Sequence, residues 1–152
     1  MIVLCTAHAT SSAPPSAFFD RWADMDTWSE WDEGIRWVRR DGPFVAGTTG
    51  SLKPRGGPKV GFVIETLVPD REFTDRSSLP GAAITIRHLV EVDGDGVTAV
   101  NIVVSIDGPL ARLWRLFVGR GIAESTPTGL RRLVEVVEAD AAITGTAAEI
   151  DR

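Results

Sequence analysis

Apolar and polar residues alternate through the middle of the chain, from Ile35 to Asp107. Alternation with a period of two is typical of strands that bury one face of an antiparallel sheet. The hairpin signal is clearest at residues 93–96, Asp-Gly-Asp-Gly, because glycine readily takes positive φ angles. The pattern predicts a seven-stranded antiparallel sheet with strands near residues 2–9, 35–40, 47–53, 59–68, 71–77, 82–92 and 97–107.

Two of these strands show which side chains should face the interior. In the strand over 82–92, one face holds Ile84, Ile86, His88, Val90 and Val92. In the strand over 97–107, one face holds Val100, Ile102, Val104 and Ile106, with Asn101 on the other. His88 is therefore a polar group within an aliphatic inward face.

A short helix is predicted between the first two strands. Residues 14–23 place Phe18, Phe19 and Trp22 on one stripe, and Pro14 and Pro15 suit a first helical turn. The polar residues 10–12 offer a side-chain cap. We expect residues 24–27 to break this helix and residues 28–32 to form one further turn.

A long helix is predicted after the turn at residues 107–109, with apolar residues at helical spacing as far as Val137. Gly119, Gly121 and Pro127 interrupt it, since glycine weakens a helix and proline removes a hydrogen bond. We expect a kink, or a restart of the helix with Ser125 or Thr126 as its cap. The glycines either leave room beneath the helix or mark its break.

Composition narrows the classes of function. The 152 residues carry a formal net charge of −5, which argues against nucleic acid as a partner. The single cysteine excludes an intrachain disulfide and suits a reducing cytoplasm. No apolar run approaches the roughly 20 residues of a membrane span. The sequence is compatible with a homodimer.

The acidic residues Asp24, Asp26, Glu30 and Asp32 match no metal-binding loop. Two histidines and one cysteine make a zinc site improbable. The sequence contains no nucleophile elbow, phosphate loop or dinucleotide fingerprint. We therefore expect neither a metal nor a cofactor.

Several segments carry a family resemblance. They are Ala13-Pro14-Pro15 with Phe18-Phe19, the Trp/Asp-rich hinge over residues 24–31, the turn over 93–98 and residues 106–110 before the last helix. Over residues 1–140 the chain resembles the START-like, helix-grip superfamily, and specifically the SRPBCC or polyketide cyclase/dehydrase group. The resemblance implies an α+β helix-grip domain: a curved seven-stranded sheet wrapped around a long C-terminal helix, with an apolar cavity between them. We expect residues 141–152 to fray.

Four of the five tryptophans lie between Phe18 and Trp37, so large aromatic side chains gather at one place. We expect Trp22 in the core and predict that the cavity binds a small hydrophobic or aromatic molecule. Its predicted wall consists of Trp28, Trp31, Trp37, Phe62, Phe73, Ile86, His88, Ile102 and Phe117.

His88 is the best candidate for chemistry, because burial among aliphatic side chains disfavours its charged form. It could serve a ligand, or it could be structural, bonded to a backbone carbonyl, Asn101 or Ser105. The alternative function is a polyketide cyclase or dehydrase, in which His88 would act with Arg76 or Asn101. A protein-interaction module of the co-chaperone kind is a third hypothesis.

Overall fold

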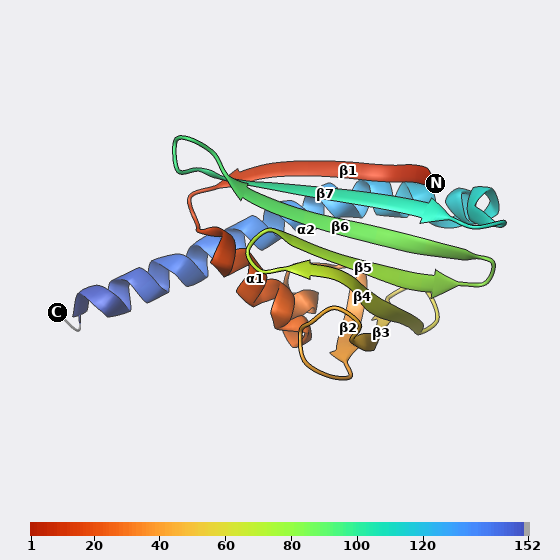
Figure 1. The fold of residues 1–152 in the computed structure, drawn as a ribbon, viewed down its shortest axis with the longest axis horizontal. Helices are drawn as coiled ribbons and strands as arrows, with labels where there is room; N and C mark the ends of the chain where they lie inside the picture. The colour runs from red at the N-terminus through yellow and green to blue at the C-terminus, as the bar shows by residue number, and fades with distance from the viewer. Residues whose placement is uncertain (151–152) are drawn as a thin grey trace.

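The computed structural model describes the backbone of residues 1–150 and the side chains of residues 1–143. A single sheet lies in front of one long helix, and two short helices lie at one end of the sheet (Figure 1). The elements follow in the order β1 (Ile2–Ser11), α1 (Pro15–Ala23), η1 (Met25–Glu30), β2 (Ile35–Arg40), β3 (Thr49–Pro54), β4 (Val60–Val68), β5 (Glu72–Leu79), β6 (Ala82–Val92), β7 (Thr98–Asp107) and α2 (Ala111–Ile150).

The sheet has seven strands in the order β1-β7-β6-β5-β4-β3-β2, and every neighbouring pair is antiparallel. Irregular pairing interrupts β1, β2 and β4, and such bulges bend and twist a strand. The helix α2 packs chiefly against β1. The predicted helix-grip fold, with its seven strands, long C-terminal helix and short helices after the first strand, is confirmed.

The start of α1 differs from the sequence prediction. Pro14 takes the cap position, Pro15 begins the helix, and no side chain caps it. The predicted cap from residues 10–12 is wrong because β1 continues to Ser11, whose hydroxyl accepts from the Ala13 amide at 3.1 Å and donates to Glu138 at 2.8 Å. The second helical turn also begins earlier than expected, since η1 starts directly after Asp24.

The predicted restart of the last helix is wrong, because α2 runs without a break through Pro127. Proline has no amide hydrogen, so the carbonyl of Ala123, four residues earlier, loses its usual donor. The Cys5 sulfur on β1 lies 3.9 Å from that oxygen and 3.7 Å from the Thr6 oxygen, so its one weak thiol donor is shared between the two carbonyls. The hydroxyl of Thr128 bonds the next carbonyl, that of Glu124, at 3.3 Å. Fraying beyond residue 140 stays a prediction, and residues 151–152 of that tail lie outside the described part of the chain.

An aromatic core fills the space where α1 and η1 meet the sheet. Phe73 of β5 is fully buried, and its ring centroid lies 6.2 Å from Trp22, 6.1 Å from Trp28 and 5.1 Å from Phe44. Such tilted and edge-on ring pairs are favourable beyond the area they bury. The core therefore fixes α1 and η1 against the inner face of the sheet.

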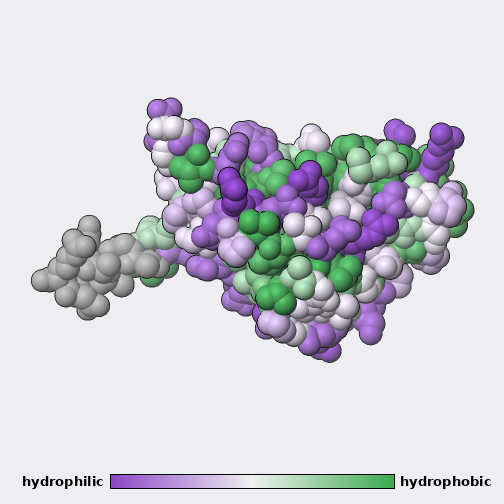
Figure 2. Space-filling model, in the orientation of Figure 1, coloured by the Kyte–Doolittle hydropathy of each residue, from purple (hydrophilic) through white to green (hydrophobic). Residues whose placement is uncertain are grey.

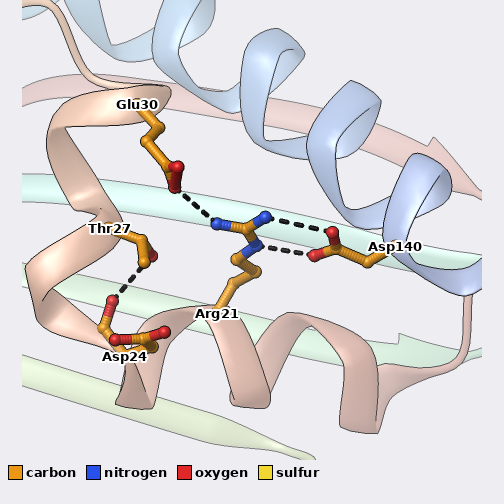
Figure 3. Close-up of polar contacts among 5 residues, drawn as sticks. All are labelled: Arg21, Asp24, Thr27, Glu30 and Asp140. Atoms are coloured by element: carbon orange, nitrogen blue, oxygen red, sulfur yellow. Dashed lines mark hydrogen bonds and ion pairs between the residues drawn. The ribbon is translucent and has the colours of Figure 1, made fainter.

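Arg21 ties the two short helices to α2 (Figure 3). Its guanidinium donates to both carboxylate oxygens of Asp140, at 2.6 and 3.0 Å, and to Glu30 at 2.8 Å. The hydrogen bonds and charge of Arg21 lower the pKa of Asp140. Paired N–H groups of one guanidinium fix orientation as well as distance. Arg21 thus holds α1 and η1 at a defined position along α2.

Within the described part of the chain, no helix is both long enough and apolar enough to cross a membrane.

Gly50→Ala should destabilise the protein by about 1–3 kcal/mol, the usual cost of overpacking a core. A Cβ atom at Gly50 would lie 2.5 Å from the backbone oxygen of Arg39 and equally close to the Phe62 ring. Gly56→Ala is the control, since a Cβ there meets nothing within 4 Å. Urea unfolding measures both variants, and equal midpoints would show that β3 accommodates the added methyl group.

Candidate functional site

A cavity of about 100 Å³ lies between the inner face of the sheet and α2. Aromatic side chains from α1 and η1 form one side of it, aliphatic side chains from β6 and β7 form another, and α2 covers it. The lining residues are Trp22, Trp28, Trp31, Asp32, Ile35, Ile86, His88, Ile102, Val104, Ser125, Thr126, Gly129, Leu130 and Leu133. None of these described lining residues is a lysine or an arginine.

The register of the sheet positions the sheet side of the cavity. His88 lies opposite Ile102, and Ile86 lies opposite Val104, so these four side chains point to the same face. On α2, Leu130 and Leu133 lie at i and i+3 and are both buried. The residues of β6 and β7 that line the cavity are therefore on the face that the alternation predicted to point inward.

A second hollow, of about 260 Å³, adjoins the cavity and shares Trp31, Asp32, Ser125 and Gly129 with it. We call it the outer hollow. It lies between residues 31–34 and residues 121–132 of α2, and an ion pair of 2.7 Å between Glu33 and Arg132 joins its two sides. A ligand approaching from this side would pass from a polar surface to an apolar interior.

His88 contributes a neutral imidazole to the cavity wall. Its Nδ1 lies 2.9 Å from the backbone oxygen of Phe73, which can only accept, so Nδ1 carries the proton and Nε2 is an acceptor. Burial lowers the pKa of His88 to about 4, although the bond to Phe73 acts in the opposite direction. The imidazole also stacks on the Phe73 ring at 4.6 Å. His88 therefore has the structural role that the sequence suggested, a hydrogen bond to a backbone carbonyl, and it also lines the cavity.

Asp75 is a buried acid that sequence reasoning did not select. It lies on β5 between Ile64 and Ile86 of the neighbouring strands, and only 5% of its surface is exposed. Its Oδ2 has no hydrogen-bond partner among the described residues, and burial raises the pKa of Asp75 to about 7. The alternation along β5 could have indicated that Asp75 points inward, because it places Asp75 on the same face as Phe73. It does not line the cavity.

The predicted wall residues fall into three groups. Trp28, Trp31, Ile86, His88 and Ile102 line the cavity. Phe62 and Phe73 are buried in the hydrophobic core and are not among the lining residues. Trp37 and Phe117 lie outside it, with exposed fractions of 36% and 73%.

Local packing explains the two residues that lie outside. The irregular pairing of β2 between Ile35 and Trp37 shifts the alternation, so Ile35 lines the cavity and Val38 is buried. The Trp37 ring instead lies 5.3 Å from the Arg39 guanidinium. On α2, the side that holds Ala111 faces the sheet, which leaves Phe117 outward. The predictions that Trp37 and Phe117 line the cavity are therefore wrong.

The proposed catalytic partners of His88 lie on the opposite face of the sheet. Arg76 forms two hydrogen bonds of 2.9 Å with Asp107 and one of 3.2 Å with Thr85. The side-chain oxygen of Asn101 lies 2.8 Å from Nδ1 of His8. Alternation places these side chains on the outer surface, where hydrophilic and apolar groups are interspersed (Figure 2). The predicted grouping of His88 with Arg76 or Asn101 is therefore wrong.

Asp75 and His88 should give opposite pH dependences of stability. The raised pKa of Asp75 means that stability is lost as pH rises from about 4 to about 7. The lowered pKa of His88 means that stability is lost as pH falls from 6.5 to about 4, because the unfolded chain binds the proton first. Asp75→Asn should remove the first effect and keep the second, which contributes a slope of up to about 1.4 kcal/mol per pH unit.

Urea unfolding between pH 4.5 and 8 measures this slope. The variant should also be more stable than the parent protein above pH 7, because it buries no charge there. Asp95→Asn, in the exposed turn after β6, is the control and should reproduce the parent profile. An unchanged profile for Asp75→Asn would contradict the assigned protonation states.

Several solved structures share this architecture. The crystal structure of hypothetical protein jhp0584 from Helicobacter pylori superposes with a TM-score of 0.73 and 14% identity, over 88% of this chain and 86% of that chain. TTHA0849 from Thermus thermophilus superposes with a TM-score of 0.68 and 17% identity, over 90% of this chain and 97% of that chain. The di-domain ARO/CYC StfQ from the steffimycin biosynthetic pathway superposes with a TM-score of 0.66 and 12% identity, over 93% of this chain and 52% of that chain. At these identities the likeness shows the fold alone.

No curated protein matches the sequence. A sequence family described as polyketide cyclase / dehydrase and lipid transport matches residues 4–138, which is most of the chain. This match agrees with the helix-grip architecture and with the resemblance carried by the hinge and turn segments. The chain belongs to the polyketide cyclase / dehydrase and lipid transport family.

Proposed function

We propose that the protein binds a small hydrophobic or aromatic molecule in the cavity between the sheet and α2. The observation that carries this proposal is the wall itself, in which three tryptophans and aliphatic side chains surround one neutral imidazole. Ligand sites in proteins are commonly apolar hollows with a few placed polar groups. The description of the family, which includes lipid transport, supports the same class of function.

The size of the cavity bounds the ligand. Its 100 Å³ is smaller than the roughly 300–1,000 Å³ of pockets for drug-sized molecules. An engineered apolar cavity of about 150 Å³ in another protein binds benzene. A single ring, or a chain of similar volume, is therefore the ligand that suits the described conformation. A longer ligand would extend into the outer hollow past Gly129.

Catalysis as a cyclase or dehydrase is the second candidate, and the family description favours it. The Nε2 atom of His88 could accept a proton from a ligand. Such an enzyme also needs a polar group that stabilises the developing enolate. Arg76 and Asn101, the groups considered for that role, are engaged on the outer face of the sheet. Binding is therefore the function that the geometry supports better.

The partner in this proposal is the small molecule, and a homodimer stays compatible with it. The cytoplasmic location expected from the single cysteine belongs to the same proposal.

A side chain placed at Gly129 should block the site. A Cβ at this position would lie 3.9 Å from the Trp31 carbonyl, so Gly129→Leu can be built and projects where the cavity meets the outer hollow. We expect the parent protein to bind toluene or phenol with one-to-one stoichiometry in titration calorimetry. Gly129→Leu should weaken that binding about tenfold or more.

Gly121→Leu is the matched control, because it makes the same substitution in the same helix. Gly121 lines only the outer hollow, and a Cβ there meets nothing within 4 Å. Both variants replace glycine with a better helix former, so both should fold. Equal affinities of the two variants would place the bound ligand elsewhere, and the absence of binding by the parent protein would overturn the proposed function.

A further inference from the structure

Large apolar side chains are exposed at the start of α2. Leu116 and Phe117 have exposed fractions of 81% and 73%, and Leu110 and Leu113 have exposed fractions of 43% and 49%. Single exposed apolar residues are normal on a protein surface, but a contiguous group of them marks a surface that contacts something else. These four residues lie close together in the chain, so they form one patch.

The patch lies on the side of α2 that faces away from the sheet. Residues three or four positions apart share one side of a helix, and here they are Leu113, Leu116, Phe117 and Arg120. The opposite side contacts the sheet, since Ile122 packs against the core and a Cβ at Gly119 would lie 3.9 Å from Leu4 of β1. We call the side that holds Leu113, Leu116, Phe117 and Arg120 the outer face of α2.

Two contacts fix this end of α2 to the turn between β5 and β6. The indole N–H of Trp114 donates to the Pro80 carbonyl at 2.7 Å, and the Leu110 amide donates to the Gly81 carbonyl at 2.9 Å. The turn lies at the end of the molecule that also holds the N-terminus (Figure 1). The outer face is therefore held outward, and it cannot turn toward the sheet without breaking these contacts.

The apolar side chains of the outer face lie among basic residues. Arg112, Arg115 and Arg120 are exposed, and no acid occurs over residues 108–123. Glu124, the first acid after this segment, pairs with Arg120 at 3.1 Å. Arg112 and Arg115 have no ion-pair partner among the described residues. The whole chain carries a formal net charge of −5, so this segment has the opposite sign to the rest.

The charge of the segment separates the candidate occupants of the outer face. A second copy of the chain is disfavoured, because a twofold contact pairs a surface with itself and would bring the same arginines of two chains together. An anionic lipid surface supplies phosphates for the arginines and hydrocarbon for the apolar side chains in one contact. It also needs no matching pockets for Leu116 and Phe117, which protrude from the helix, whereas a protein partner does.

We propose that the outer face of α2 binds the surface of an anionic membrane. Leu113, Leu116 and Phe117 enter the boundary between the headgroups and the acyl chains, and Arg112 and Arg115 pair with lipid phosphates. The first turns of α2 then lie along one leaflet, as amphipathic interfacial helices do. This contact does not involve the cavity, so it stands apart from the proposed function.

Binding to vesicles tests the proposal. Co-sedimentation with vesicles of phosphatidylglycerol and phosphatidylcholine in equal parts is compared with co-sedimentation with vesicles of phosphatidylcholine alone. The parent protein should bind the mixed vesicles about tenfold more tightly or better, because two arginines gain anionic neighbours. Added salt should weaken this binding, since it screens exposed charges. Equal binding to both kinds of vesicle would overturn the assignment to anionic lipid.

One apolar substitution links the binding to the outer face. Leu116→Ser removes an exposed side chain that the proposal inserts into the lipid, and it should weaken binding to the mixed vesicles about tenfold. Ile143→Ser is the matched control, because Ile143 lies near the other end of α2 and is 70% exposed. Both side chains are exposed, so both variants should fold. Equal affinities of the two variants would overturn the placement of the contact.

The arginines are tested in the same way. Arg112→Gln and Arg115→Gln should each weaken binding to the mixed vesicles about fivefold and leave any residual binding to phosphatidylcholine unchanged. Arg131→Gln removes another exposed arginine of α2, beyond the outer face, and should bind like the parent protein. Equal losses in all three variants would show a response to net charge alone and would overturn the assigned phosphate contacts.

The oligomeric state gives the remaining outcomes a meaning. Absence of vesicle binding by the parent protein overturns the proposal. If sedimentation equilibrium then shows a dimer that Leu116→Ser converts to a monomer, the outer face is an interface between two copies of the chain. If it shows a monomer, an acidic protein is the occupant that the charge of this face leaves. Titration of the cavity with toluene or phenol is independent of all these results.

Discussion

The hydrogen bond from His88 Nδ1 to the Phe73 carbonyl organises the interior of this protein. It joins β6 to β5 through a side chain as well as through their backbones, and it places the imidazole flat against the Phe73 ring. Because a carbonyl accepts and never donates, the bond also selects the tautomer of the neutral ring. The position of the aromatic core and the chemistry of the cavity wall therefore depend on the same contact.

The aromatic core extends this constraint to the helices. The Trp22 ring approaches both His88 and Phe73, and Trp28 donates its N–H to the Trp22 carbonyl. Arg21, one residue before Trp22, reaches Glu30 on η1 and Asp140 on α2 (Figure 3). Trp22 thus holds α1 against the sheet, and Arg21 holds it against η1 and α2. These contacts hold α1 between the sheet and α2, which covers the cavity.

Two buried titratable side chains, Asp75 and His88, lie on the inner face of the sheet. Their surroundings shift their pKa values in opposite directions. Desolvation raises the pKa of Asp75 and lowers that of His88, so both groups favour their neutral forms near neutral pH. An interior without charge suits an uncharged ligand. The ion pair between Arg76 and Asp107 lies on the outer face of the sheet, where water reaches both side chains.

The alternation of residue types, together with the turn signals between the strands, by itself determined the strands, the antiparallel character of the sheet and the inward phase of β6 and β7, because a strand presents successive side chains to opposite faces. The same rule placed His88 inward and Asn101 outward. Only the tertiary structure decided that Trp37 and Phe117 lie outside the cavity, that α2 continues through Pro127, and that Oδ2 of the inward-facing Asp75 has no hydrogen-bond partner among the described residues. Periodicity reports which residues share a face. What covers that face, and which polar atoms find partners there, depends on contacts such as Cys5 with Ala123 and Arg21 with Asp140, between residues far apart in the chain.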